Sequence, residues 1–464
     1  MGIADRNLLY IIIFILLLLC IAVFIMMWLD IRIKVENLKG IEKFRSVFNN
    51  RVRYKNASFN VVLLGVDFER LLKYEGKEEL NKYAEYVHNI LKFSIAKNSY
   101  NIYLYDGCFC LLINTDETKC NSIVLSILKR ANEYSDILKN KYGIIYRAGI
   151  YHIADSSVNS DDALRAAKIA YEYCVRDNLS IYFVSQQMID NENKKERIHR
   201  SLLSALENRE FQPFVQPIVN SDGKYAGGEV LSRWLTSENS LINPNEYIAE
   251  MIQADLIDNL DFSMLEATCR KLQECNNDLW LTCNFTRVTL SRTDFRERFE
   301  AIVQKYNFDR TRLYVEITED SKSRADEILT DNLNYCKKLG VNVALDDLGS
   351  GYSSIADLCD YPIDLIKIDR FIVQKTVDEK GFNFLKGFIE LAHDLGIKVL
   401  CEGVESRLQN EMVLRASADY IQGYFYARVL PIDEADSFFL KYNSSITNQG
   451  VDNGKENGNY QELQ

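Results

Sequence analysis

A long apolar stretch lies close to the start of the chain, where residues 8–29 carry no charged side chain. As a helix that rises 1.5 Å per residue, this stretch is about 33 Å long, enough to cross a hydrocarbon core of about 30 Å. It is too long for the apolar region of a cleaved signal peptide. The pattern therefore predicts one transmembrane helix, an anchor over residues 1–29.

Basic side chains gather after this stretch, whereas Arg6 is the basic side chain before it. The positive-inside rule then places everything after Asp30 in the cytoplasm. We therefore expect a single-pass protein of the cytoplasmic (inner) membrane, with everything after the anchor in the cytoplasm. The basic positions after the stretch are Arg32, Lys34, Lys39, Lys43, Arg45, Arg51 and Arg53.

The next two segments differ in their hydrophobic period. Residues 30–54 carry apolar side chains at spacings of three and four, which predicts an amphipathic linker helix. Residues 55–190 alternate short β-rich runs with helical stretches, which predicts a mixed α/β domain. The charged and apolar-poor stretch 191–197 is then expected to be a linker to the next domain.

Residues 197–443 show eight β-like runs separated by helical spacers, a pattern typical of an α/β fold, the (β/α)8 barrel. After the barrel, residues 444–464 contain almost no apolar side chain able to pack and are predicted to be a disordered tail. The eight runs are residues 211–219, 227–234, 279–286, 313–319, 341–347, 365–369, 398–404 and 420–426.

The composition argues against some classes of function. The 464 residues include 55 Lys and Arg against 66 Asp and Glu, a formal net charge of −11. This acidic balance argues against a protein that binds a nucleic acid polymer through its phosphates. The 11 cysteines form no CxxC pair, so the sequence predicts neither a disulfide framework nor a zinc site.

Polar side chains stand near the carboxyl end of most of the barrel runs, and in such a barrel these ends form the active-site face. A single carboxylate at such a place is more often a helix cap or a solvated strand end. Successive strands that each deliver a polar group to one rim instead indicate a site. The set is Glu229, Asn284, Glu316, Asp346, Asp347, Lys367, Glu402 and Gln422.

These side chains favour one kind of chemistry. Carboxylate and amide oxygens suit Mg²⁺ or Mn²⁺ rather than zinc. The adjacent Asp346 and Asp347 could bridge two ions, the arrangement that activates a water and stabilises the leaving oxygen in phosphodiester hydrolysis. Lys367 would add a fixed positive charge near the phosphate or the attacking hydroxide.

Seven segments follow one another in the order typical of one family: GGEVLSRW, CNFT, VEITED, ALDDLGSGYSS, DLIKID, CEGVES and IQGYFY. With this spacing, residues 198–442 resemble the EAL family of cyclic-di-GMP phosphodiesterases. The differences are peripheral: Val230 stands where the family has alanine, and Ala249, Met251 and Ile252 replace proline, alanine and glutamate.

The resemblance assigns a role to each candidate residue. It implies that Glu229, Asn284, Glu316 and Asp346 hold one metal ion and that Asp346 and Asp347 hold a second. Lys367, Glu402 and Gln422 would organise the attacking water, with Glu402 as the general base. Glu319 would anchor the loop after the aspartate pair, and Arg233 and Gln216 would contact the substrate.

The preceding domain resembles GGDEF diguanylate cyclases more weakly, over residues 59–184. Its signature reads YDGCF, so that Gly107 and Cys108 occupy the two acidic positions. Gly65 stands at another metal position, two residues before Asp67. The domain is therefore expected to be degenerate, a regulatory module rather than a cyclase, with GTP as a candidate ligand.

Two functions from different classes follow. The first is a membrane-anchored phosphodiesterase that opens cyclic di-GMP to linear pGpG with divalent metal ions. The alternative is a receptor that binds cyclic di-GMP without cleaving it and signals to a protein partner. The retained metal residues favour the enzyme. A homodimer is expected from the resemblance together with the apolar stripe of the linker helix.

Overall fold

The computed structural model divides into two compact units, Met1–Lys194 and Lys195–Gln464. The border lies inside helix α6 (Gln186–Glu207), so the charged stretch 191–197 is helical. The structure describes residues 39–52, 58–94, 99–105, 107–133, 144–153, 158–238, 240–275, 278–318, 327–348 and 357–448.

The first unit is built on a five-stranded sheet with the order β2-β3-β1-β4-β5. Every pairing is antiparallel except that of β4 with β5. The helices include α2 (Phe68–Ser94), α3 (Glu117–Glu133) and α5 (Ser160–Arg176). The strands are β1 (Phe59–Val66), β2 (Tyr100–Tyr105), β3 (Cys108–Asn114), β4 (Tyr146–Ile153) and β5 (Ile181–Phe183).

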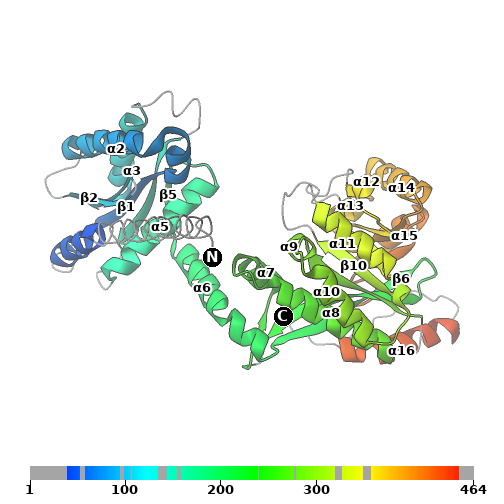
Figure 1. Cartoon of the computed structure of the whole chain (residues 1–464). Coiled ribbons are helices and arrows are strands. Elements are labelled where there is room, and N and C mark those ends of the chain that lie inside the picture. The colour runs from blue at the N-terminus through cyan, green and yellow to red at the C-terminus, as the bar shows by residue number, and fades with distance from the viewer. Residues whose placement is uncertain are drawn as a thin grey trace, which may run out of the picture. The chain divides into compact units, whose positions relative to one another are not determined.

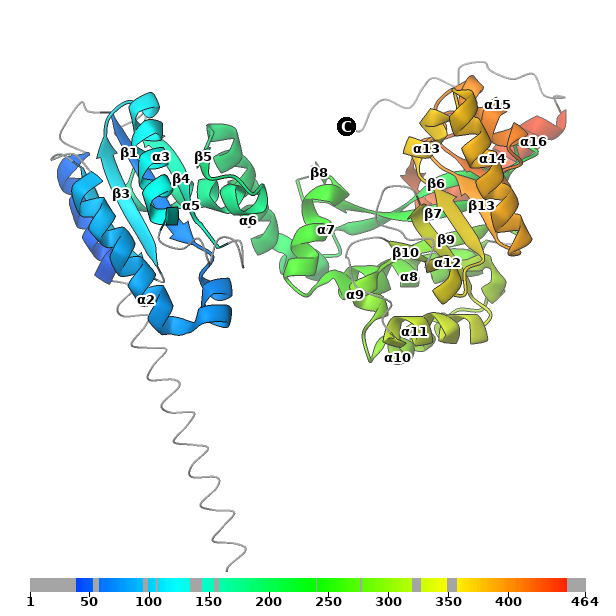
Figure 2. The same ribbon diagram turned by 90° about the horizontal axis from the view of Figure 1, so that it is seen from above.

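Alternate residues of β1 face two separate cores, as expected for a strand covered on both sides. Val62 and Leu64 lie in the core beneath α2 and α3, whereas Val61 and Leu63 lie in the core beneath α5. Figures 1 and 2 show these helices on opposite faces of the sheet.

The predicted linker helix belongs to this unit. Residues 39–51 form a helix, and its Phe44 and Phe48 are fully buried in the core beneath α5. This part of the apolar stripe therefore packs inside the unit and is not available for a coiled coil.

Residues 30–38 and 53–54 of the predicted linker, and the predicted span 8–29, lie outside the described residues. Among the helices that the structure does describe, none is both long and apolar enough to cross a membrane.

The second unit holds an eight-stranded barrel, which confirms the predicted barrel (Figures 1 and 2). Its strands pair in the order β6-β7-β9-β10-β11-β12-β13-β14, and β14 pairs back to β6 to close the ring. They are β6 (Phe211–Asn220), β7 (Tyr225–Leu235), β9 (Trp280–Thr286), β10 (Leu313–Thr318), β11 (Asn342–Leu348), β12 (Leu365–Ile368), β13 (Lys398–Cys401) and β14 (Tyr420–Gln422).

The helices of this unit cover the outside of the barrel, and two short strands extend its sheet: β8 (Leu241–Ile242) beside β7 and β15 (Leu430–Pro431) beside β6. The helices are α7 (Pro244–Gln253), α8 (Ile257–Glu274), α9 (Arg287–Leu290), α10 (Phe295–Lys305), α11 (Glu327–Lys338), α12 (Asp357–Asp360), α13 (Arg370–Lys375), α14 (Glu379–Asp394), α15 (Arg407–Arg415) and α16 (Ala435–Asn448).

The first strand departs from the predicted alternation of strands and helices. β6 runs antiparallel to both β7 and β14, and a short turn rather than a helix joins β6 to β7. The Asn220 side chain accepts hydrogen bonds from the backbone N–H groups of Asp222 and Lys224, and Gly223 has a positive φ of 76°. This compact turn, which needs glycine at that φ, is the physical reason why the prediction of a helical spacer here was wrong.

The inside of the barrel has an apolar layer below a polar one. Ile218, Trp280, Tyr314, Ala344, Leu365 and Leu400 form one buried cluster, against which Tyr420 packs. The Trp280 ring lies 5.0 Å from the rings of both Tyr314 and Tyr420, measured between centroids. Two residues further along β10 and β12 come Glu316 and Lys367, in the layer above.

Helix α16 corrects the predicted start of the tail. The tail was expected to begin at residue 444, but α16 continues through Asn448. Its buried Phe439 belongs to the large core of the second unit, and Asn443 donates to and accepts from the backbone of Tyr225. These contacts hold the helix against the rest of the unit as far as Asn443, and the helix continues from there to Asn448. Residues 449–464 lie outside the described residues.

Candidate active site

Seven of the predicted residues come together at the carboxyl ends of the barrel strands. Glu229 is at the centre of one half of the group. Its two carboxylate oxygens accept hydrogen bonds from Asn284 Nδ2 at 3.0 Å and Gln422 Nε2 at 2.8 Å. These amides come from β9 and β14, so three strands hold this carboxylate in one orientation.

Lys367 links that half to the other carboxylates. Its ammonium Nζ is 2.5 Å from Glu316, 2.7 Å from Glu402, 3.1 Å from Glu229 and 3.2 Å from Asp346. The Lys367 side chain is only 1% exposed. The sequence predicted a positive charge at the rim, but it did not predict that this charge lies at the centre of four carboxylates.

Burial and crowding shift the pKa values of these groups. Removal from water raises the pKa of Glu316 well above its usual range, and the neighbouring carboxylates of Glu229 and Asp346 raise it further against the opposing effect of Lys367. Burial likewise raises the pKa of Glu402 to about 8. For Glu229, burial acts upward, but Lys367 and the two amide donors outweigh it and lower the pKa.

The two predicted substrate residues lie on the hairpin of β6 and β7. Gln216 pairs directly with Glu229 across the two strands, so both side chains lie on the same face. Arg233 follows Glu229 by four residues along β7, on that same face, and its guanidinium donates to the Ser232 carbonyl at 2.9 Å. Glu319 and the side chain of Asp347 lie outside the described residues.

The donor set fits a hard divalent cation. Asn284 Oδ1, Glu316 Oε2 and Gln422 Oε1 are buried oxygen atoms that have no hydrogen-bond partner among the described residues. Buried acceptors normally have partners, and oxygen ligands of this kind are those that Mg²⁺ and Mn²⁺ prefer. Among the described residues, no group of three or more His, Cys, Asp or Glu side chains is already arranged to hold a metal ion, and the ammonium of Lys367 lies among the rim carboxylates.

A supporting network beneath the rim escaped sequence analysis. Asp261 on α8 is buried, and its Oδ2 accepts hydrogen bonds from the Thr286 N–H at 3.1 Å, the Thr286 hydroxyl at 3.0 Å and the Thr289 hydroxyl at 2.6 Å. Thr286 is the last residue of β9, two residues after Asn284. The signal in the sequence was the threonine that caps the short helix α9, but nothing there pointed to Asp261 as its partner.

In the first unit, the two glycines that the sequence resemblance aligns with cyclase metal residues lie beside aromatic side chains. A Cβ atom at Gly65 would lie 2.8 Å from the ring of Tyr171. The Tyr146 hydroxyl donates to the carbonyl of Gly107 at 2.9 Å. Tyrosine rings therefore occupy space beside both glycines, where the resemblance would place carboxylates.

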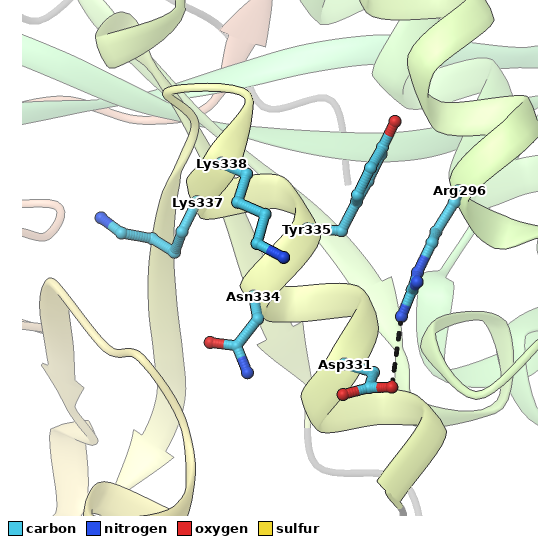
Figure 3. Close-up of a pocket in the computed structure, with 6 residues that line it drawn as sticks. All are labelled: Arg296, Asp331, Asn334, Tyr335, Lys337 and Lys338. Carbon is cyan, nitrogen blue, oxygen red and sulfur yellow. Dashed lines mark ion pairs between the residues drawn. The ribbon is translucent and has the colours of Figure 1, made fainter.

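A separate hollow of about 540 Å³ lies on the outside of the barrel between α10 and α11 (Figure 3). Two of its cations have anionic partners: Arg296 pairs with Asp331 at 3.5 Å, and Lys337 pairs with Asp364 at 2.6 Å. The hollow lies in the helical layer, and its lining residues do not include the rim residues. They are Arg296, Asp331, Asn334, Tyr335, Lys337 and Lys338.

Comparison with known proteins defines the class. Residues 199–429 match the model of the EAL domain. The barrel with its rim of carboxylates is therefore an EAL domain, as the sequence motifs predicted.

Particular relatives are found among curated proteins. The chain is similar to the cyclic di-GMP phosphodiesterase RocR of Pseudomonas aeruginosa, with 31% identity over 52% of this chain and 62% of RocR. It is also similar to the cyclic di-GMP phosphodiesterase NbdA of the same organism, with 24% identity over 88% of this chain and 54% of NbdA. The NbdA alignment thus extends into the first unit. The chain spans only about half to three fifths of the length of these two relatives.

A solved structure supports the fold. The EAL enzyme Bd1971, in a form that holds cAMP and cyclic di-GMP, matches with a TM-score of 0.51 and 21% identity. The match covers 73% of this chain and 82% of Bd1971.

Proposed function

We propose that this protein is a divalent-metal-dependent phosphodiesterase that hydrolyses cyclic di-GMP to linear pGpG. The observation that carries the proposal is the convergence of Glu229, Glu316, Asp346 and Glu402 on one rim with Asn284 and Gln422. The similarity to the cyclic di-GMP phosphodiesterases RocR and NbdA supports the choice of substrate.

In this proposal, one group of rim residues binds the metal ions and the other acts on the attacking water. Glu229, Asn284, Glu316, Asp346 and Asp347 would hold Mg²⁺ or Mn²⁺, which when bound activates a water and stabilises the leaving oxygen.

Glu402 takes the proton of the attacking water, because a group with a pKa near the working pH is the most effective base. Lys367 holds this carboxylate in place at 2.7 Å. Arg233 and Gln216 on the hairpin bind the substrate, with the Arg233 guanidinium directed to a phosphate, and Glu319 anchors the loop after the aspartate pair.

Chromatography of nucleotides tests the proposal. The full chain is incubated with cyclic di-GMP and either Mg²⁺, Mn²⁺ or a chelator. We expect pGpG with either metal ion and none with the chelator. Retention of cyclic di-GMP without cleavage under all conditions would instead favour a receptor.

We propose that residues 1–29 anchor the protein in the cytoplasmic membrane and that both units face the cytoplasm. The basic residues that follow the apolar stretch support this orientation. In sealed inside-out vesicles, added protease is expected to digest both units, and in right-side-out vesicles to leave them intact. Digestion in right-side-out vesicles would show the opposite topology.

We propose that the first unit is a degenerate GGDEF domain that regulates the barrel and makes no cyclic di-GMP. Two-metal phosphoryl transfer needs carboxylates where Gly65, Gly107 and Cys108 stand, and the ring of Tyr171 covers Gly65. With GTP and Mg²⁺ the full chain is expected to form no cyclic di-GMP, which mass spectrometry of the products would detect.

GTP is the candidate effector of this unit. An effector changes the activity of the barrel only if it binds two states of the protein unequally. The rate of cyclic di-GMP hydrolysis is therefore expected to change as GTP is raised to millimolar concentration. Rates that coincide at every GTP concentration would exclude this regulation.

We propose that the protein forms a homodimer through α14. Phe384 and Leu391 lie along one face of this helix, the C-cap residue Leu395 continues that face, and each of the three is about half exposed. Lys380 in the first turn and Asp394 in the last turn flank the same face. Two copies of α14 packed antiparallel would bring opposite charges together, so a second copy of this chain fits the face.

A substitution on α14 tests the dimer. Leu391→Lys introduces a charge into the proposed interface, whereas Leu440→Lys introduces one at an exposed leucine of α16. We expect light scattering to give twice the mass of one chain for the wild type and for Leu440→Lys, but the mass of a monomer for Leu391→Lys. A monomeric wild type would contradict the proposal.

A further inference from the structure

The single ammonium of Lys367 forms ion pairs with four carboxylates. The nearest carboxylate oxygens of Glu229, Glu316, Asp346 and Glu402 all lie within 3.2 Å of its Nζ atom. Carboxylates this close to the ammonium favour its charged form. Lys367 is therefore a permanent positive charge inside the ring.

This charge cannot easily leave the ring. Lys367 lies in β12 between Ile366 and Ile368, which are both buried, and β12 pairs with β11 on one side and β13 on the other. A lysine on a surface helix could swing into water, whereas this side chain is enclosed by the barrel and is 1% exposed. The ammonium therefore stays beside any divalent cation that the carboxylates bind.

Three of its four partners, Glu229, Glu316 and Asp346, are the carboxylates to which the proposed function assigns the divalent cation. The ammonium and the cation would consequently draw on the same carboxylates, and they would repel each other in this poorly solvated site. The lysine also stabilises the ring when little cation is present, because carboxylates packed this closely repel one another.

We propose that Lys367 is a built-in competitor of the divalent cation and thereby sets the affinity of the carboxylate ring for Mg²⁺ or Mn²⁺. The lysine weakens cation binding, so the occupancy of the site follows the cation concentration instead of being saturated at all times. This inference rests on the proposed function insofar as that function identifies the metal ligands.

Calorimetric titration of the full chain with Mn²⁺ at pH 8.5, without nucleotide, tests the inference. Lys367→Met removes the charge and keeps a side chain of similar length. We expect this variant to bind Mn²⁺ at least about tenfold more tightly than the wild type. If Lys367→Met does not give the circular dichroism of a folded protein, Lys367→Gln, which can still donate hydrogen bonds, is used for the same comparison.

Lys337→Met is the matched control, because Lys337 pairs with the single carboxylate of Asp364 at 2.6 Å and is about one-third exposed. It should leave the Mn²⁺ affinity unchanged. Lys367→Arg, which retains the charge, should not increase the affinity.

The possible outcomes separate this inference from the proposed function. If the wild type binds Mn²⁺ and neither neutral variant binds it more tightly, Lys367 is not a competitor, although the metal site stands. If the wild type binds no Mn²⁺ at all, both the inference and the metal-dependent function are wrong.

Discussion

Replacement of Glu229 by glutamine is expected to lower kcat for cyclic di-GMP hydrolysis by at least about a thousandfold, which corresponds to about 4 kcal/mol of lost transition-state stabilisation. Glutamine preserves the shape of the side chain but removes the charge that faces Lys367 at 3.1 Å. It also replaces one of the two carboxylate oxygens, which accept hydrogen bonds from Asn284 and Gln422, by an NH₂ group that cannot accept one. The site would thus lose a metal ligand and the alignment of two amides.

The matched control is Glu266→Gln. Glu266 pairs with Lys305 on the surface of the barrel, and its side chain is 43% exposed. This variant should hydrolyse cyclic di-GMP at the wild-type rate, since surface ion pairs contribute little. A Glu229→Gln variant that forms pGpG as fast as Glu266→Gln would show that this rim is not the active site.

Replacement of Asp261 by alanine is expected to reduce the free energy of unfolding by about 2–4 kcal/mol and to reduce hydrolysis as well. The change leaves the Thr286 N–H and the hydroxyls of Thr286 and Thr289 without their common acceptor in a buried place. Because Thr286 ends the strand that carries Asn284, the loss should also move that amide relative to Glu229.

Denaturant unfolding and steady-state kinetics of the same samples measure the two effects of Asp261→Ala. Asp331→Ala is the control, since Asp331 is a carboxylate with a 73% exposed side chain on α11. We expect it to change stability by less than about 0.5 kcal/mol. Equal stabilities of Asp261→Ala and Asp331→Ala would mean that the network under β9 does not support the rim.

The barrel and its rim could be predicted from the sequence because both depend on local pattern. A buried strand reads as a short apolar run, and a polar residue near its end, such as Asn284 or Gln422, marks the rim. The eight runs correspond to the eight barrel strands, which places Glu229, Glu316 and Lys367 on the same face of the barrel.

The features that could not be predicted depend on contacts between residues distant in sequence. Asp261 lies 25 residues before Thr286, and no local pattern connects them. Lys367 and Glu316 are 51 residues apart, so the central position of the lysine appears only when the barrel closes. The antiparallel β6 was missed because an apolar run has no direction in the sequence. Membrane anchoring, the metal ions and regulation by the first unit stay predictions.

The apolar layer formed by Trp280, Tyr314 and their neighbours has a consequence for the order of events during turnover. It closes the barrel below the carboxylates, so substrate enters and product leaves through the same open end. A departing product must clear the path before the next substrate arrives. Linear pGpG should therefore act as a competitive inhibitor, and its accumulation should slow the enzyme once cyclic di-GMP falls below saturation.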